Sequence, residues 1–146
     1  MVRMRKRVKM GMKYIMSSAP EIILSSYDVQ TIERWLEQTK QAPAIVDALE
    51  SELARATIVK HAELPDDRVA MGSQVTFSIE ELNKTFTKTL CYPNQLSQFE
   101  DGLSIFAPVG SAMLGLAVGQ AIEWPGQRGV QHVQIIDVQH QAAATQ

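Results

Sequence analysis

Apolar residues recur at three- and four-residue intervals in the first well-patterned part of the chain. They are Val29, Ile32, Trp35 and Leu36, which share one face of a helix. The polar residues in front of this stripe, Ser25, Ser26 and Asp28, are the candidate N-caps. Asp28 is preferred, because its carboxylate can accept a hydrogen bond from a free backbone N–H of the first turn. The spacing therefore predicts a helix from Asp28 to about Thr39.

A second stripe of the same period follows a polar turn, Lys40-Gln41-Ala42. Pro43 suits the first position of a helix, where no backbone N–H is needed. The apolar residues after it are Ile45, Val46, Leu49, Leu53 and Ala56. This helix is predicted to run to about Val59. The two segments together predict a short antiparallel helical hairpin with arms of roughly 18 to 24 Å, at ~1.5 Å per residue.

Beyond residue 68 the pattern changes from helical to alternating, which is typical of strands. After a short β-type run at 22–24, strands are expected at 75–79, 85–92 and 103–106, followed by a final hairpin at 121–124 and 130–138. Pro108 is expected to begin a single helix that Gly119 closes. The order of elements predicts an α+β fold with a mainly antiparallel sheet covered by one helix, in which residues 21–68 form the hairpin and linker and residues 69–140 form the sheet domain.

Charge is distributed unevenly along the 146 residues. The first 16 residues hold six cations and no acid, which leaves eight basic against sixteen acidic residues in the remainder. An acidic body does not attract phosphate backbones, so we expect no direct sequence-specific nucleic acid binding by the folded body. Residues 1–20 are expected to be a basic disordered tail or a misassigned start, with translation beginning at Met16.

The chain contains no apolar run near the ~20 residues that a membrane-spanning helix needs, so we expect no membrane interaction. Its single cysteine, Cys91, cannot form an internal disulfide and fits a reducing compartment. These features predict a cytoplasmic protein, and we expect a monomer.

Several short motifs after residue 70 resemble the C-terminal domain shared by the transcription factors GreA and GreB. They are Met71-Gly-Ser-Gln-Val75, Leu103-Ser104, Ala107-Pro-Val-Gly110, Ala112-Met-Leu-Gly115 and Gly119. The resemblance covers about residues 69–138 and implies an FKBP-like domain that binds RNA polymerase. It assigns the docking contact to Phe106, Ala107 and Pro108, where Gre factors tend to have an acidic residue and a serine before the proline. The short hairpin and Phe106 resemble a particular branch of this family.

The hairpin tip bears on whether the family's catalytic activity is retained. Gre factors insert a long coiled coil into the polymerase secondary channel, where acidic tip residues help to hold a magnesium ion for transcript cleavage. The corresponding tip here is Thr39, Lys40, Gln41, Ala42 and Pro43. Magnesium prefers oxygen ligands, and this tip has no carboxylate; Glu37 and Asp47 lie about one turn down opposite arms. We therefore expect no catalytic residue, no metal, no cofactor and no enzyme activity.

Other candidate sites are weaker. His61, His132 and His140 lack the spacing of a zinc site, and Ser104 and Ser111 lack a nucleophile elbow. The expected function is noncatalytic RNA polymerase binding near the secondary channel, in competition with Gre factors. The alternative is an FKBP-like prolyl isomerase or chaperone module. Direct control of nucleoside diphosphate kinase is a third possibility, which rests only on a name used within the family.

Overall fold

The chain was analysed as a computed structural model, which describes residues 20–126 and 129–140. The expectations for residues 1–19 fall outside the described residues. In chain order the elements are β1 (Ile23–Ser25), α1 (Ser26–Gln38), α2 (Pro43–Arg55), β2 (Thr57–Val59), the 3-10 helix η2 (His61–Glu63), β3 (Ser73–Ile79), the 3-10 helix η3 (Glu80–Leu82), β4 (Lys84–Cys91), the 3-10 helix η4 (Pro93–Gln98), β5 (Gly102–Ser104), α3 (Pro108–Met113), β6 (Ala121–Gly126) and β7 (Gly129–His140). Among these elements, no helix has the length and apolar character to cross a membrane.

The larger sheet has five strands in the order β5-β4-β3-β7-β6. All neighbouring strands are antiparallel except β4 and β5, which are parallel. Along β3 the side chains of Val75, Phe77 and Ile79 are buried and alternate with partly exposed polar residues, as the sequence pattern predicts. The predicted α+β fold with a mainly antiparallel sheet is confirmed.

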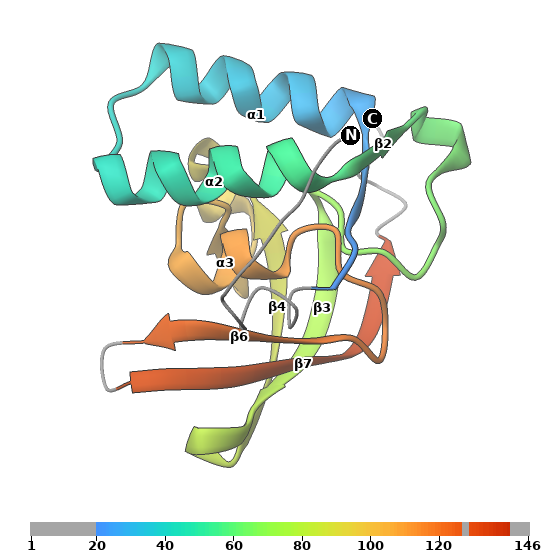
Figure 1. Ribbon diagram of the computed structural model, residues 1–146, viewed down its shortest axis with the longest axis vertical. Coiled ribbons are helices and arrows are strands. Elements are labelled where there is room, and N and C mark those ends of the chain that lie inside the picture. Colours follow the sequence, from blue (N-terminus) through green and yellow to red (C-terminus); the bar gives the residue numbers. More distant parts are fainter. Residues whose placement is uncertain (1–19, 127–128, 141–146) are drawn as a thin grey trace, which may run out of the picture.

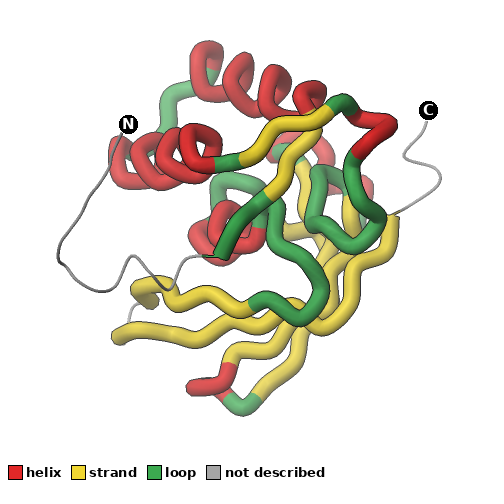
Figure 2. Tube along the Cα trace, turned by 45° about the vertical axis from the view of Figure 1, so that its right-hand side comes forward, coloured by secondary structure: helices red, strands yellow, loops and turns green. Residues whose placement is uncertain are grey.

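A second, two-stranded sheet lies at the base of the helical hairpin, where β1 and β2 run parallel (Figure 2). The prediction that the second helix continues to Val59 was wrong, because α2 ends at Arg55. The residues after it are mostly β-branched and favour an extended backbone. The Thr57 N–H donates to the Ile22 carbonyl at 2.9 Å, and Leu24 pairs with Ile58. This pairing closes the base of the hairpin.

The start of α1 also differs from the prediction. Its N-cap is Ser25, whose hydroxyl oxygen accepts a hydrogen bond from the Asp28 N–H at 3.1 Å. Asp28 lies inside the first turn and is buried. Asp28 as the N-cap was therefore wrong: the serine three residues earlier provides the acceptor, and the carboxylate of Asp28 is left to bind another part of the chain.

Helix α3 begins at Pro108, as predicted, but ends at Met113 rather than near Gly119. The chain turns at Gly115, which has a φ of +84°, a conformation that favours glycine. A Cβ atom on Gly115 would lie 2.7 Å from Ile22 Cβ. The early end of α3 therefore lets β1 pass close to the backbone of Gly115, where the Ile23 N–H donates to the Gly115 carbonyl at 3.2 Å.

One hydrophobic cluster contains residues from both the hairpin and the sheet. Ile32 and Leu49 enter it from the hairpin, Met113 from α3, and Val75 and Ile135 from the sheet. Figure 1 shows the hairpin stacked above α3, which lies between α2 and the strands. The hairpin is therefore packed against the sheet domain along its base, and its tip is free.

Candidate functional site

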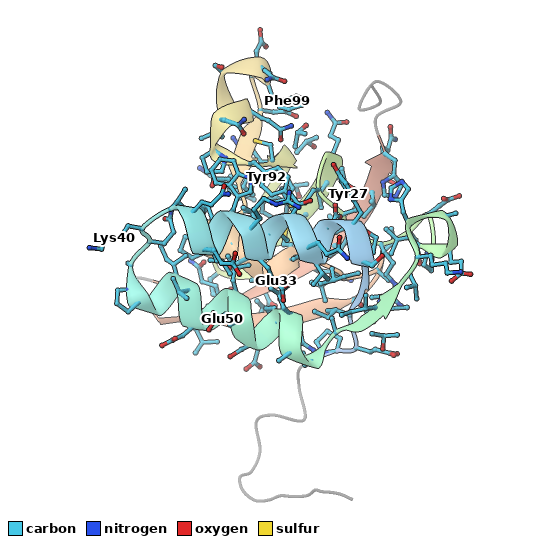
Figure 3. All side chains as sticks on the ribbon, turned by 90° about the horizontal axis from the view of Figure 1, so that it is seen from above. Tyr27, Glu33, Lys40, Glu50, Tyr92 and Phe99 are labelled. Carbon is cyan, nitrogen blue, oxygen red and sulfur yellow. The ribbon has the colours of Figure 1, made fainter. Side chains whose placement is uncertain are left out.

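The hairpin tip, residues 39–43, connects α1 to α2 in a tight turn. Both the N–H and the hydroxyl of Thr39 donate to the Trp35 carbonyl, at 3.0 and 2.6 Å. The Ala42 carbonyl accepts from the N–H groups of Ile45 and Val46 and so begins α2. Figure 3 shows Lys40 pointing away from the body at this end. The tip therefore presents an exposed cation.

The nearest acids to this tip along the chain are Glu37 and Asp47, on α1 and α2 respectively. Both side chains are exposed. Among the described residues, neither lies close enough to two other possible ligands to share a metal ion with them. Glu37 and Asp47 therefore lie on solvent-exposed faces of their helices. Within the residues that the structure describes, the tip therefore has no assembled carboxylate site.

Residues 106–108, called the 106–108 loop, lie between β5 and α3 and include Pro108, the first residue of α3. Hydrogen bonds to Ser104 set the shape of this loop. The Ser104 hydroxyl accepts from the Phe106 N–H at 3.0 Å, and the Ser104 carbonyl accepts from the Ala107 N–H at 2.9 Å. A Cβ atom on Gly110 would lie 2.4 Å from that same carbonyl oxygen. Glycine is therefore required for α3 to approach the loop this closely.

The three residues assigned to docking by the sequence differ in exposure. Phe106 is 7% exposed and belongs to the core, Ala107 is half-buried, and Pro108 is exposed. Phe106 thus supports the loop from beneath and offers little surface of its own. The surface that this loop can present to another molecule consists of Pro108 and part of Ala107.

Aromatic rings join this loop to the hairpin. Trp35 of α1 stacks on Tyr92, with ring centroids 5.7 Å apart, and meets Phe106 edge-on at 6.3 Å. Tyr92 lies beside α1 (Figure 3), and burial raises the pKa of its phenol, so the ring is neutral at physiological pH. The indole of Trp35 therefore contacts the sheet domain at two points and orients the hairpin relative to the 106–108 loop.

A buried carboxylate makes a second connection between the two parts. The Asp28 carboxylate accepts a hydrogen bond from the Met71 N–H at 3.1 Å. Burial raises the pKa of Asp28, while the hydrogen bond from Met71 acts in the opposite direction. Asp28 therefore ties the first turn of α1 to the segment that leads into β3.

Arg68 makes a third connection, beneath β1. Its Nη1 atom donates to the carbonyl oxygens of Glu21 and Gly115, each at 3.1 Å. The Gly115 N–H in turn donates to the Val69 carbonyl at 2.9 Å. These bonds hold the entry to the hairpin against the segment that follows α3.

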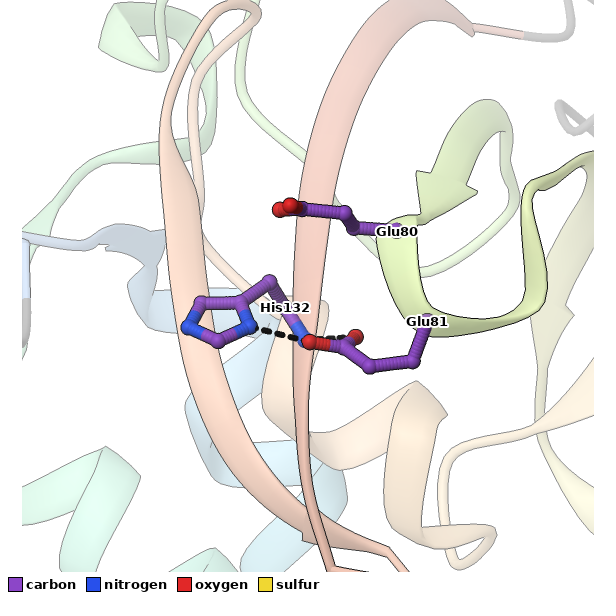
Figure 4. Close-up of side chains that lie close together, drawn as sticks. All are labelled: Glu80, Glu81 and His132. Atoms are coloured by element: carbon purple, nitrogen blue, oxygen red, sulfur yellow. Dashed lines mark hydrogen bonds and ion pairs between the residues drawn. The ribbon is translucent and has the colours of Figure 1, made fainter.

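A charged cluster lies at the turn between β3 and β4 (Figure 4). The Nδ1 atom of His132 pairs with the Glu81 carboxylate, and the His132 backbone N–H donates to the other oxygen of that carboxylate at 2.7 Å. The Nε2 atom lies 3.2 Å from Glu123. The Glu81 hydrogen bond raises the pKa of His132, and the same contact lowers the pKa of Glu81.

The potential ligand atoms of Glu80, Glu81 and His132 lie within 4.8 Å of one another, so the set has the spacing of a cation site. Both ring nitrogens of His132 nevertheless already face carboxylates. The geometry therefore favours a protonated imidazolium between Glu81 and Glu123 that braces the turn against β6 and β7. Sequence reasoning missed this cluster, because Glu81 and His132 are 51 positions apart.

The other two histidines are exposed, as expected of surface residues. The Nδ1 atom of His140 lies 3.1 Å from the Ser73 hydroxyl, and its Nε2 atom lies 3.0 Å from the Asp66 carbonyl. His61 contacts the ring of Tyr27 edge-on. These contacts fix the end of β7 and the turn of η2.

Two family descriptions together match most of the described chain. Residues 64–140 match "Transcription elongation factor, GreA/GreB, C-term", and residues 20–59 match "Rnk N-terminus". The division between the two matches falls in the segment that follows β2. The sheet and the hairpin therefore correspond to two separately recognised parts.

Individual proteins are similar over most of the chain. The "Regulator of nucleoside diphosphate kinase" of Escherichia coli (strain K12) is 38% identical over 129 residues, which are 87% of this chain and 95% of the relative. The structure "Prokaryotic transcription elongation factor GreA/GreB from Nitrosomonas europaea" is 43% identical, with a TM-score of 0.66, and covers 83% of this chain and 99% of that one. The "Transcription elongation factor GreA" of Chlorobium phaeobacteroides (strain BS1) is 29% identical over 104 residues, 70% of this chain and 65% of the relative.

Proposed function

The chain belongs to the GreA/GreB family, in the branch of the regulator of nucleoside diphosphate kinase, and on this premise we propose that it is a noncatalytic regulator of transcription that binds RNA polymerase. In this proposal it docks near the secondary channel and competes there with Gre factors. The family assignment made from the sequence motifs is confirmed. What we propose beyond the family is binding to RNA polymerase and competition with Gre factors.

The observation that carries the proposal is a short hairpin, with no carboxylate at its tip, held against the 106–108 loop. Helix α1 has 13 residues and extends about 20 Å at ~1.5 Å per residue. Cleavage of RNA by a Gre-type mechanism needs hard oxygen ligands for magnesium. Residues 39–43 supply none from a carboxylate. A protein of this shape can occupy the polymerase without catalysing cleavage.

Docking is proposed to use the exposed ring of Pro108, with the partly exposed Ala107 beside it. Phe106 supports the loop from the core, and its contact with Trp35 fixes where the hairpin points once the loop is bound. We propose the FKBP-like type for the sheet domain on the same family resemblance. The tip residues then lie at the end of an arm whose direction is set by the aromatic contacts.

The alternative function, a prolyl isomerase or chaperone, requires an aromatic-lined pocket for proline. Trp35, Tyr92 and Phe106 are engaged with one another instead. Phe77 is 2% exposed and stacks on Phe86. These rings contribute to packing, which favours the polymerase-binding function over the isomerase.

Direct binding to bacterial core RNA polymerase, measured by biolayer interferometry, tests the proposed function. We expect saturable binding that a GreA protein displaces. The same preparation is expected to give no turnover of a proline peptide in an isomerisation assay. Absence of polymerase binding, or measurable isomerase turnover without it, contradicts the proposal.

A further inference from the structure

A groove of about 510 Å³ lies between α1 and α2, on the face of the hairpin that Figure 3 shows from above. Its apolar lining comes from both helices and from β2: Val29, Leu36, Val46, Leu53, Ala54 and Ile58. Its remaining lining residues are acids, Glu33, Glu37 and Glu50. Figure 3 shows Glu33 and Glu50 on this face, one on each helix. The groove therefore has an apolar floor and an acidic rim.

This composition defines the chemistry of an occupant. None of the described residues that line the groove is basic, so the rim attracts cations. Ile58, at one end, is 49% exposed and lacks an apolar cover. A complementary occupant is a basic segment that carries apolar side chains on one side.

Residues 1–16 of the chain have this composition. They contain six cations and no acid. Five of their nine apolar residues recur at intervals of three and four, a spacing that places residues on one side of a helix. These five, called the apolar set, are Met1, Met4, Val8, Met12 and Ile15; Val2, Met10, Tyr14 and Met16 fall outside this spacing. The period of the apolar set is the one that α1 and α2 show.

The described chain begins beside one end of the groove. The carbonyl of Pro20 accepts a hydrogen bond from Arg55, at the end of α2, and the carbonyl of Ile22 accepts one from the N–H of Thr57, next to Ile58. A helix from Met1 to Ile15 spans about 21 Å, close to the roughly 20 Å length of α1. The residues between Ile15 and Pro20 can extend about 13 to 17 Å, enough for the segment to turn back along the groove.

We propose that residues 1–16 bind along the groove between α1 and α2, with the apolar set on its floor and the cations against Glu33, Glu37 and Glu50. Attachment to the same chain gives the segment an effective concentration on the order of millimolar, so a modest intrinsic affinity is sufficient. The basic disordered tail or misassigned start that the sequence predicts for residues 1–20 is the alternative to this proposal. The proposed contact also covers the exposed face of the hairpin with positive charge, whereas the described residues alone present an acidic one.

Methyl NMR of the full-length chain tests this contact. With labelled methionine, isoleucine, leucine and valine methyl groups, we expect nuclear Overhauser effects between Met4 or Met12 and Leu36 or Val46. Trypsin provides a second readout, because it cleaves after the basic residues of the segment. Cleavage there is expected to be about tenfold slower in the wild type than in the E33Q/E37Q/E50Q variant, whose rim charges are removed.

The matched control is E63Q/E80Q/E100Q, which removes three exposed carboxylates outside the hairpin. This variant is expected to keep both the methyl contacts and the slow cleavage. Equal cleavage rates in the wild type and the rim variant, or the absence of methyl contacts in the wild type, overturn the proposal. Sedimentation of a dimer, with groove contacts that arise only between differently labelled copies, also overturns it and identifies a second copy as the occupant.

Discussion

The indole ring of Trp35 lies flat against the phenol ring of Tyr92, with centroids 5.7 Å apart and planes 4° from parallel. Trp35 belongs to the hairpin, and Tyr92 follows the strand β4 of the sheet. The same indole meets Phe106 edge-on at 6.3 Å. One half-buried side chain therefore connects the two parts of the molecule that the proposed function uses together.

Replacing Trp35 by alanine is expected to lower the free energy of unfolding by roughly 2 to 3 kcal/mol, because a half-buried indole and two aromatic contacts are lost. Urea denaturation followed by circular dichroism measures this change. Tyr27→Ala is the control, since Tyr27 is 64% exposed, and a change within about 0.5 kcal/mol is expected. Equal effects of the two substitutions argue against Trp35 as the connection.

Gly115→Ala and Gly119→Ala form a matched pair, because both glycines have a positive φ, +84° and +91°. A Cβ atom on Gly119 meets nothing within 4 Å, whereas one on Gly115 meets Ile22 at 2.7 Å. We expect Gly119→Ala to cost about 1 to 2 kcal/mol, from backbone strain alone. Gly115→Ala is expected to cost about 2 to 4 kcal/mol, because the clash with β1 is added. Thermal and urea unfolding of both variants measure the difference, and equal costs contradict the close approach of β1.

The sequence predicted the parts of the molecule that depend on local patterns. The apolar stripe at Val29, Ile32 and Trp35 corresponds to α1, and the alternation at Val75, Phe77 and Ile79 corresponds to β3. Pro43 and Pro108 both begin helices, as their missing N–H groups allow. Periodicity and proline chemistry act within a few residues and are visible in the sequence.

The predictions that failed depend on partners far away along the chain. The second helix was predicted to run through Thr57 and Ile58, but these residues pair with β1, more than 30 positions earlier. Helix α3 ends before Gly115, whose backbone lies close to Ile22, a residue more than 90 positions earlier. For the candidate site, docking by the 106–108 loop stays a prediction from the family resemblance. The burial of Phe106 against Trp35 was not predicted, because tertiary packing sets it.

The cluster around His132 predicts a pH-dependent stability. The folded pKa of His132 is raised, so its contribution is fully present below the ordinary value of 6.5 and is lost as pH rises through the folded value. The folded pKa of Glu81 is lowered, so its contribution is present above the ordinary value of 4.5 and is lost as pH falls through the folded value. The pair therefore stabilises the fold most between about pH 4.5 and 6.5.

Free energies of unfolding from pH 3 to 9 for the wild type and His132→Gln test this dependence. The difference between the two proteins is expected to peak in that range and to shrink at both ends. His61→Gln is the control, because His61 is an exposed histidine outside the cluster. A difference between wild type and His132→Gln that is constant with pH contradicts the brace.

Pro108→Arg tests the proposed docking surface without disturbing the core, since Pro108 is exposed at the first position of α3. A charged side chain at this point is expected to weaken binding to RNA polymerase about tenfold. Pro65→Arg makes the same substitution at an exposed proline of the linker and is expected to leave binding unchanged. Unchanged binding by Pro108→Arg moves the docking surface elsewhere on the molecule.

Competition with a GreA protein for RNA polymerase tests the central claim most directly. Backtracked elongation complexes are incubated with GreA and increasing amounts of the chain, and the rate of transcript cleavage is measured. The proposed function predicts that cleavage falls with increasing chain concentration, and that the chain without GreA produces none above the polymerase's own background. Undiminished GreA cleavage at saturating chain, or cleavage stimulated by the chain alone, contradicts it.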